Sequence, residues 1–145
     1  MKKYLFSFFI GLFSIGVIFF FYPKNIEFQT VFLKGKNYSV SYEVEIADTP
    51  QKAQQGLMYR KYLPQNQGML FVFPESKIIR MWMKNTYIPL DMIFIDSQNK
   101  VVCLYENALP LDESIITCPY SVQKVLELNA GEIKNKKIQL GDFLS

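Results

Sequence analysis

The feature that most constrains this chain is an uninterrupted apolar run near its N-terminus. No charged residue occurs from Tyr4 to Tyr22. A helix over these 19 residues rises about 28 Å, close to the roughly 30 Å hydrocarbon core of a bilayer. Lys2 and Lys3 precede the run, and the positive-inside rule therefore places the N-terminus in the cytoplasm. We predict an uncleaved transmembrane helix over residues 4–22 that anchors the chain in the cytoplasmic membrane, with the remainder on the periplasmic or extracellular side.

A cleaved signal peptide is the alternative interpretation of the same run. Its candidate cleavage site is Ser14-Ile15-Gly16, and cleavage there leaves a mature chain that begins at Val17. Either way, we assign residues 1–24 to a membrane anchor or signal segment. Residues 25–145 contain no Gly-, Ser- or Pro-rich break longer than a turn, which indicates one extracytoplasmic domain.

Composition excludes several classes of function. The chain has no histidine and only two cysteines, so it lacks the residues for histidine-dependent catalysis and for histidine- or cysteine-rich metal centres. Beyond residue 24 there are 13 basic and 13 acidic residues, a balance that gives no electrostatic footprint for nucleic acid. We therefore expect no metal, no cofactor and no nucleic-acid partner.

Short strands dominate the predicted secondary structure of residues 25–145. Apolar and polar residues alternate over residues 39–46, which indicates a strand with one buried face. Thr49 before Pro50 predicts the start of a short helix that runs to about Met58. Further strands are expected at residues 28–33, 69–73, 78–84, 92–95, 101–105, 125–128 and up to 142, with a turn or short helix at 130–137. The predicted class is α+β, with a mostly antiparallel, small barrel-like sheet and one or two short helices, in addition to the N-terminal transmembrane helix.

Several short motifs of this domain follow one another in a defined order. They are Gly56-Leu57-Met58-Tyr59-Arg60, Gly68-Met69-Leu70-Phe71-Val72-Phe73, Trp82-Met83-Lys84-Asn85-Thr86, Ile88-Pro89-Leu90-Asp91 and Phe94-Ile95-Asp96. Together with residues 125–131 and the closing Gly141-Asp142, they resemble the prokaryotic family called domain of unknown function 192, over about residues 38–143. The resemblance implies a compact, mostly β domain often found behind a signal or anchor. It implies no established activity.

Polar residues that interrupt the apolar stretch between residues 69 and 95 are the candidates for a site. A buried charge needs a partner, and one interpretation is a structural network in which Lys84 or Arg80 pairs with Asp91. The other is a pocket for a small polar or anionic ligand. We expect Trp82 to be mostly buried and Lys84 to be partly exposed within reach of an acid. The predicted ligand-binding set is Arg80, Trp82, Lys84, Asn85, Thr86, Asp91 and Glu127, with Asp142 as a further polar candidate.

Other chemistries have weaker support in the sequence. Five methionines fall within residues 58–92, and their thioethers suit copper(I), although methionine without histidine is more typical of core packing. Hydrolysis needs two facing carboxylates, for example Asp91 with Asp96 or Glu127. No Gly-x-Ser-x-Gly elbow and no phosphate loop occurs.

The two cysteines bear on the redox state of the compartment in which the domain resides. Cys103 and Cys118 are predicted to form a disulfide bond if the domain is exported to an oxidising compartment. The alternative is two unpaired thiols.

Three functions remain open at this point. The first is an extracytoplasmic domain that binds a small polar ligand or an envelope component without catalysis. The second is an envelope hydrolase that uses carboxylates. The third is a structural or accessory partner of another membrane protein. The residues favour binding over catalysis.

Overall fold

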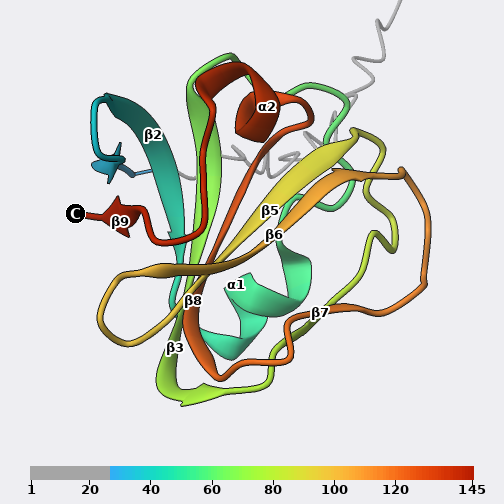
Figure 1. Cartoon of the computed structure of the whole chain (residues 1–145). Coiled ribbons are helices and arrows are strands. Elements are labelled where there is room, and N and C mark those ends of the chain that lie inside the picture. Colours follow the sequence, from blue (N-terminus) through green and yellow to red (C-terminus); the bar gives the residue numbers. More distant parts are fainter. Residues whose placement is uncertain (1–26) are drawn as a thin grey trace, which may run out of the picture.

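The computed structural model describes residues 27–145, which form a curled main sheet, a two-stranded sheet and two short helices (Figure 1). The main sheet has the strand order β6-β5-β8-β3-β2-β1-β9, and β4 pairs with β7. The elements are β1 (Phe28–Lys34), β2 (Ser39–Ala47), α1 (Pro50–Gln55), β3 (Gln67–Lys77), β4 (Arg80–Met81), β5 (Leu90–Ile95), β6 (Val101–Ala108), β7 (Ile116–Thr117), β8 (Val122–Asn129), α2 (Glu132–Lys136) and β9 (Phe143–Leu144).

The main sheet is mostly antiparallel and curls into a half-barrel. Among its pairs of neighbouring strands, only β2 and β3 run parallel. The C-terminal strand β9 pairs with β1 at one edge, and Phe143 forms a bridge with Lys100, just before β6 at the other edge. The C-terminal segment thus links the two edges of the sheet. The predicted mostly antiparallel β class with one or two short helices is confirmed at this level.

Both faces of the central strands are buried, which explains their continuous apolar runs. Every residue of β5 is buried. Alternate residues of β3, β5 and β8 enter two separate clusters: Met92 and Phe94 pack in the cluster toward α1, whereas Ile93 and Ile95 pack in the cluster that includes Ile133 of α2. The sheet is therefore the middle layer between two cores.

The structure corrects several predicted element boundaries. The strand expected at residues 78–84 is reduced to β4, because the chain enters a turn at residues 84 and 85. Helix α1 ends at Gln55 rather than near Met58, because Gly56 adopts a positive φ of 48° and closes the helix. Strand β3 continues past Pro74, where the pairing with β8 is irregular and tolerates a residue without an N–H group. The last strand is Phe143–Leu144, and the residues before it form turns.

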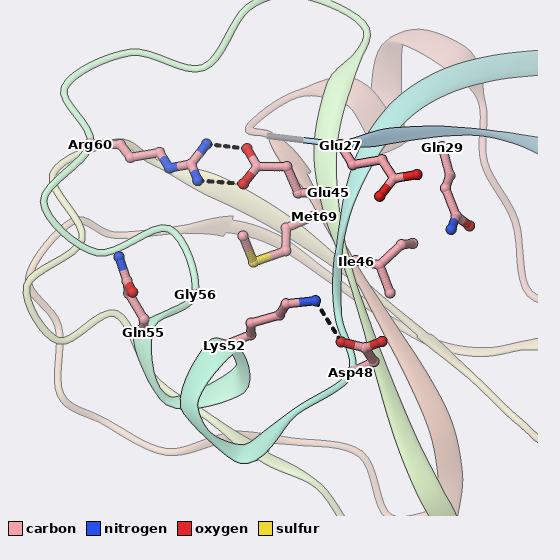
Figure 2. Close-up of a pocket in the computed structure, with 10 residues that line it drawn as sticks. All are labelled: Glu27, Gln29, Glu45, Ile46, Asp48, Lys52, Gln55, Gly56, Arg60 and Met69. Carbon is pink, nitrogen blue, oxygen red and sulfur yellow. Dashed lines mark hydrogen bonds and ion pairs between the residues drawn. The ribbon is translucent and has the colours of Figure 1, made fainter. Parts of the chain in front are cut away.

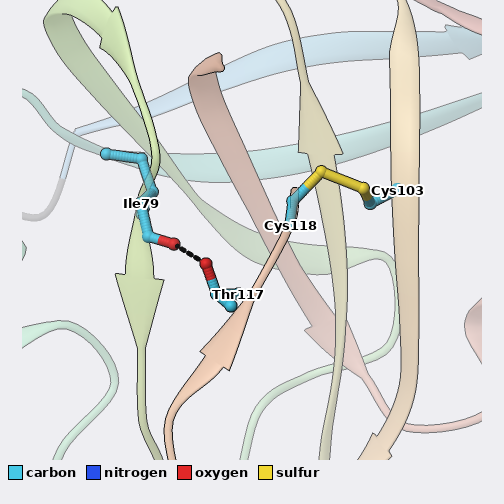
Figure 3. The surroundings of a disulfide bond; sticks show 4 residues. All are labelled: Ile79, Cys103, Thr117 and Cys118. Carbon is cyan, nitrogen blue, oxygen red and sulfur yellow. Dashed lines mark hydrogen bonds between the residues drawn. A yellow bond between two sulfur atoms is a disulfide. The ribbon is translucent and has the colours of Figure 1, made fainter. Parts of the chain in front are cut away.

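Cys103 of β6 and Cys118, which follows β7, form a disulfide bond with their Cα atoms 6.0 Å apart (Figure 3). Thr117 donates a hydrogen bond from Oγ1 to the carbonyl oxygen of Ile79, at 2.8 Å. The disulfide bond attaches the end of β7 to the main sheet, and the hydrogen bond joins β7 to the residue before β4.

Replacing Cys103 and Cys118 together by alanine should lower the free energy of unfolding by about 3 kcal/mol, the chain-entropy value for a loop of about 15 residues. Urea unfolding of the double variant and of the wild type, without reductant, measures the difference. Mass spectrometry of the non-reduced protein supplies the control. Two free thiols in the wild type would contradict the bond.

Within residues 27–145, no helix combines the length and apolarity needed to cross a bilayer. The predicted anchor over residues 4–22 lies outside the described residues.

Candidate functional site

Three of the predicted ligand-binding residues line one cavity beside helix α1. The cavity has a volume of about 360 Å³, within the ordinary range for small-molecule sites. We call it the aromatic pocket; it is lined by Gln51, Gln54, Gln55, Met58, Tyr59, Trp82, Lys84 and Asn85. No aspartate or glutamate of the described chain lines it.

An alternating segment brings Trp82 and Lys84 to this pocket. Met81 and Met83 are buried in the core, and the intervening Trp82 side chain is therefore turned outward, with 43% of its surface exposed. The backbone N–H of Met83 donates to the carbonyl oxygen of Asp112 at 2.8 Å, which fixes the segment. Trp82 was predicted to be mostly buried because methionines flank it, and that prediction was wrong: in an extended segment neighbouring side chains point to opposite sides.

Asn85 and Tyr59 hold each other in place. Both have positive φ, 53° for Asn85 and 64° for Tyr59, a conformation that asparagine tolerates and a bulky tyrosine rarely adopts. The N–H of Tyr59 donates to the carbonyl oxygen of Asn85 at 2.8 Å, and Asn85 Nδ2 donates to Tyr59 Oη at 2.9 Å. These paired hydrogen bonds join the loop after α1 to the loop after β4.

Helix α1 supplies amide side chains to the same pocket. Thr49 caps the helix by accepting a hydrogen bond from the N–H of Lys52 at 3.3 Å, as its sequence predicts. Gln51 and Gln54, three residues apart, lie on one helix face. Sequence reasoning missed these glutamines and Tyr59. The signal for the glutamines is the sequence of the predicted helix itself, which has no large apolar residue over Pro50–Gln55.

Lys84 has a different partner from the one expected. Its ammonium lies 5.2 Å from the centre of the Trp82 ring in a cation–π contact, and the structure contains no ion pair of Lys84 with an acid of residues 27–145. The predicted salt bridge was therefore wrong.

Lys84→Met should change the free energy of unfolding by less than about 1 kcal/mol, because only this cation–π contact is lost. Urea unfolding checks this, and a loss of several kcal/mol would reveal a buried acid that depends on Lys84.

The remaining predicted residues do not join the pocket. Arg80 is exposed on β4, opposite Thr117. Thr86 is buried and donates from Oγ1 to the carbonyl oxygen of Lys84 at 3.2 Å. Asp142 accepts a hydrogen bond from the N–H of Gln139 at 2.7 Å and one from Tyr38 Oη, which is a turn-stabilising role.

Asp91 and Glu127 are both buried in the sheet, and neither forms an ion pair with a cation of residues 27–145. Asp91 is fully buried and accepts hydrogen bonds from two backbone N–H groups. Glu127 lies between Met69 and Met92 on the neighbouring strands, and burial raises its pKa to about 8. The predicted network of Lys84 or Arg80 with Asp91 is absent.

A second cavity, of about 500 Å³, lies between α1 and strands β2 and β3 (Figure 2). Two ion pairs occupy it: Arg60 Nη2 lies 2.7 Å from Glu45 Oε2, and Lys52 Nζ lies 2.7 Å from Asp48 Oδ1. The hydrogen bond with Glu45 raises the pKa of the Arg60 guanidinium. Because both cations already face carboxylates, this cavity offers no unpaired cation of the described chain to an anionic ligand, and Glu27 is its lining carboxylate without an ion pair among residues 27–145.

Four of the five methionines between residues 58 and 92 are packed in the core. Met69, Met81, Met83 and Met92 are buried in one core cluster, and Met58 lines the aromatic pocket. Residues 27–145 contain no group of three or more His, Cys, Asp or Glu side chains arranged for a metal ion.

Comparison with known proteins identifies the family. The model of the DUF192 family, described as an uncharacterized ACR, matches residues 31–145. The chain belongs to this family. The match covers the whole sheet apart from the start of β1, so the resemblance noted in the sequence is confirmed. No curated protein matches the chain.

Solved structures share the DUF192 fold. One is a candidate transcription regulator from Sinorhizobium meliloti 1021, 41% identical with a TM-score of 0.80, covering 84% of this chain and 97% of that one. Another is a protein of unknown function from Novosphingobium aromaticivorans DSM 12444, 31% identical with a TM-score of 0.79, covering 81% of this chain and 84% of that one.

Proposed function

We propose that this DUF192 protein is an anchored extracytoplasmic domain that binds a small polar ligand in the aromatic pocket without chemical conversion. One observation carries the proposal: Trp82, Lys84 and Asn85 come together with aromatic and amide side chains from other segments around one cavity. Ligand sites typically combine apolar walls with a few placed polar groups in this way.

The composition of the aromatic pocket favours binding over hydrolysis. Glycan hydrolysis requires a pair of carboxylates across the substrate, and the aromatic pocket has no carboxylate in the described chain. The regulator description of the Sinorhizobium neighbour does not extend to this chain in our proposal, because the 13 basic and 13 acidic residues beyond residue 24 leave that part of the chain without the net positive charge that attracts DNA.

The extracytoplasmic location is supported by two independent features. One is the uncharged run from Tyr4 to Tyr22 behind Lys2 and Lys3. The other is the disulfide bond of Cys103 and Cys118, since such bonds persist in oxidising compartments.

The anchor makes a direct prediction about fractionation. Full-length protein should stay in the membrane pellet through a carbonate wash, because residues 4–22 would be embedded in lipid. A variant that lacks residues 2–24 should be absent from the pellet, and it is the control. N-terminal sequencing that finds Val17 as the first residue of the wild type would contradict the anchor.

Ligand binding is tested by the thermal stability of the full chain in a sugar-free detergent. The probes are inorganic phosphate, free amino acids, and neutral mono- and oligosaccharides. A ligand that binds only the native state raises the melting temperature by mass action. The rise should occur in the wild type and in Arg80→Met, whose side chain lines neither cavity, and should be smaller in Lys84→Met, which removes one polar group of the pocket. Equal rises in Lys84→Met and the wild type, or no rise with any probe, would overturn the proposal.

A further inference from the structure

The aromatic pocket presents two exposed flat rings. Trp82, the one tryptophan of the chain, is 43% exposed, and Tyr59 is 62% exposed. Covering exposed aromatic surface with an apolar face is favourable, because it removes that surface from water. A sugar ring has such a face, made of C–H bonds, and carries its hydroxyl groups at the edge.

The polar groups of the pocket are mostly neutral amides. Gln51, Gln54 and Gln55 of α1 each offer N–H donors and a carbonyl acceptor. A hydroxyl group is both donor and acceptor, and an acetamido group offers an N–H and a carbonyl, so amide side chains match both substituents of a sugar.

The charges of the pocket argue against the other ligand classes. An ammonium group is held by a carboxylate or by the open face of an aromatic ring. The described lining residues include no carboxylate, and the Lys84 ammonium already lies over the Trp82 ring and would repel a second cation. Phosphate sites usually contain arginine or clustered backbone N–H groups, whereas the one cation here, Lys84, lies over the Trp82 ring. A neutral ligand with hydroxyl edges fits these groups best.

One ring of the aromatic pocket is positioned by two contacts, which reduces the entropy lost on binding. Asn85 donates to Tyr59 Oη, and the Tyr59 ring packs edge-on against Tyr87 with centroids 6.3 Å apart. The orientation of the Tyr59 ring is therefore set before a ligand arrives.

We propose that the ligand of the aromatic pocket is a saccharide, with a sugar ring stacked on an aromatic side chain and its edge groups hydrogen-bonded by the α1 glutamines. This inference rests on the proposed binding function and names its ligand class. Lys84 supplies one further donor at the edge of the ring.

Trp82 fluorescence tests the inference directly, because the chain contains no other tryptophan. Full-length protein in a sugar-free detergent is titrated with the N-acetylglucosamine trimer, maltotriose, inorganic phosphate and glycine. We expect a saturable emission change with at least one saccharide and none with phosphate or glycine. The double variant Gln51→Leu/Gln54→Leu should bind that saccharide at least about tenfold more weakly, since two hydrogen bonds are lost. The control Gln98→Leu, an exposed glutamine in the β5–β6 loop, should bind like the wild type.

The other outcomes separate the two proposals. A saturable response to phosphate or glycine, with none to either saccharide, would overturn the saccharide inference and leave the binding function standing. A saccharide affinity unchanged in the double variant would also overturn the inference. No response to any probe, together with no thermal shift, would overturn both.

Discussion

The free energy of unfolding should fall by about 4 kcal/mol as the pH rises from about 5 to about 8, and Glu127→Gln should abolish most of this fall. Glu127 is 4% exposed, and burial raises its pKa from 4.5 to about 8. Its cross-strand neighbours are Met69 and Met92, whose thioethers stabilise a carboxylate poorly. The neutral acid is therefore the form that the native core accepts.

The direction of this pH dependence follows from the linkage between folding and the ionisation of Glu127. Between pH 4.5 and pH 8 the native state keeps the Glu127 proton and the unfolded state has lost it. Stability then decreases with rising pH, by up to a factor of about ten in the folding equilibrium constant per pH unit. Below this window both states are protonated and the full stability is present; above it both are ionised and the contribution is lost.

Urea unfolding from pH 5 to pH 9 measures the effect as a difference between variants. Glu127→Gln keeps the shape of the side chain without a titrating proton, so its profile should be flatter and its stability higher than that of the wild type above pH 8. Glu106→Gln, at an exposed position of β6, is the matched control and should follow the wild type. Parallel profiles for Glu127→Gln and the wild type would show that Glu127 is ionised in the folded protein.

Asp91→Ala should destabilise the protein by about 3 to 5 kcal/mol. Asp91 Oδ1 accepts from the N–H of Asn107 at 2.9 Å, and Oδ2 accepts from the N–H of Ile133 at 2.8 Å. The carboxylate thereby joins β5 to β6 and to the first turn of α2, where the helix dipole favours a negative charge. Alanine leaves both buried N–H groups without a partner, at a cost of about 1 to 3 kcal/mol each.

Chemical unfolding of a short series checks this role. Asp91→Asn retains one acceptor oxygen and should lie between the wild type and Asp91→Ala. Lys84→Met is the comparison that separates this structure from the predicted ion pair, because it should leave stability nearly unchanged. If Asp91→Ala cost less than about 1 kcal/mol, or if Lys84→Met cost as much as Asp91→Ala, the hydrogen bonds assigned to Asp91 would not be what stabilises this part of the fold.

The sequence by itself determined the local elements and the family. Alternation over residues 39–46 defines β2, and the strands expected at residues 92–95 and 101–105 correspond to β5 and β6. Thr49 and Pro50 define the start of α1. These predictions succeed because hydrophobic periodicity, helix capping and turn chemistry act between residues close in the chain. The ordered motifs identified the DUF192 family for the same reason, since they are contiguous strings.

Tertiary structure alone decided the partners of the polar residues. Asp91 is bound by an N–H group 42 residues away, and Glu127 is enclosed by two strands that reach it from distant parts of the chain. Lys84, Trp82 and Asn85 form a pocket only because α1 and its following loop, some 30 residues earlier, fold over them. A sequence pattern indicates which buried polar residues need a hydrogen-bond or ion-pair partner. The partner itself is determined by the sheet register and by loop packing, which depend on residues far apart in the chain.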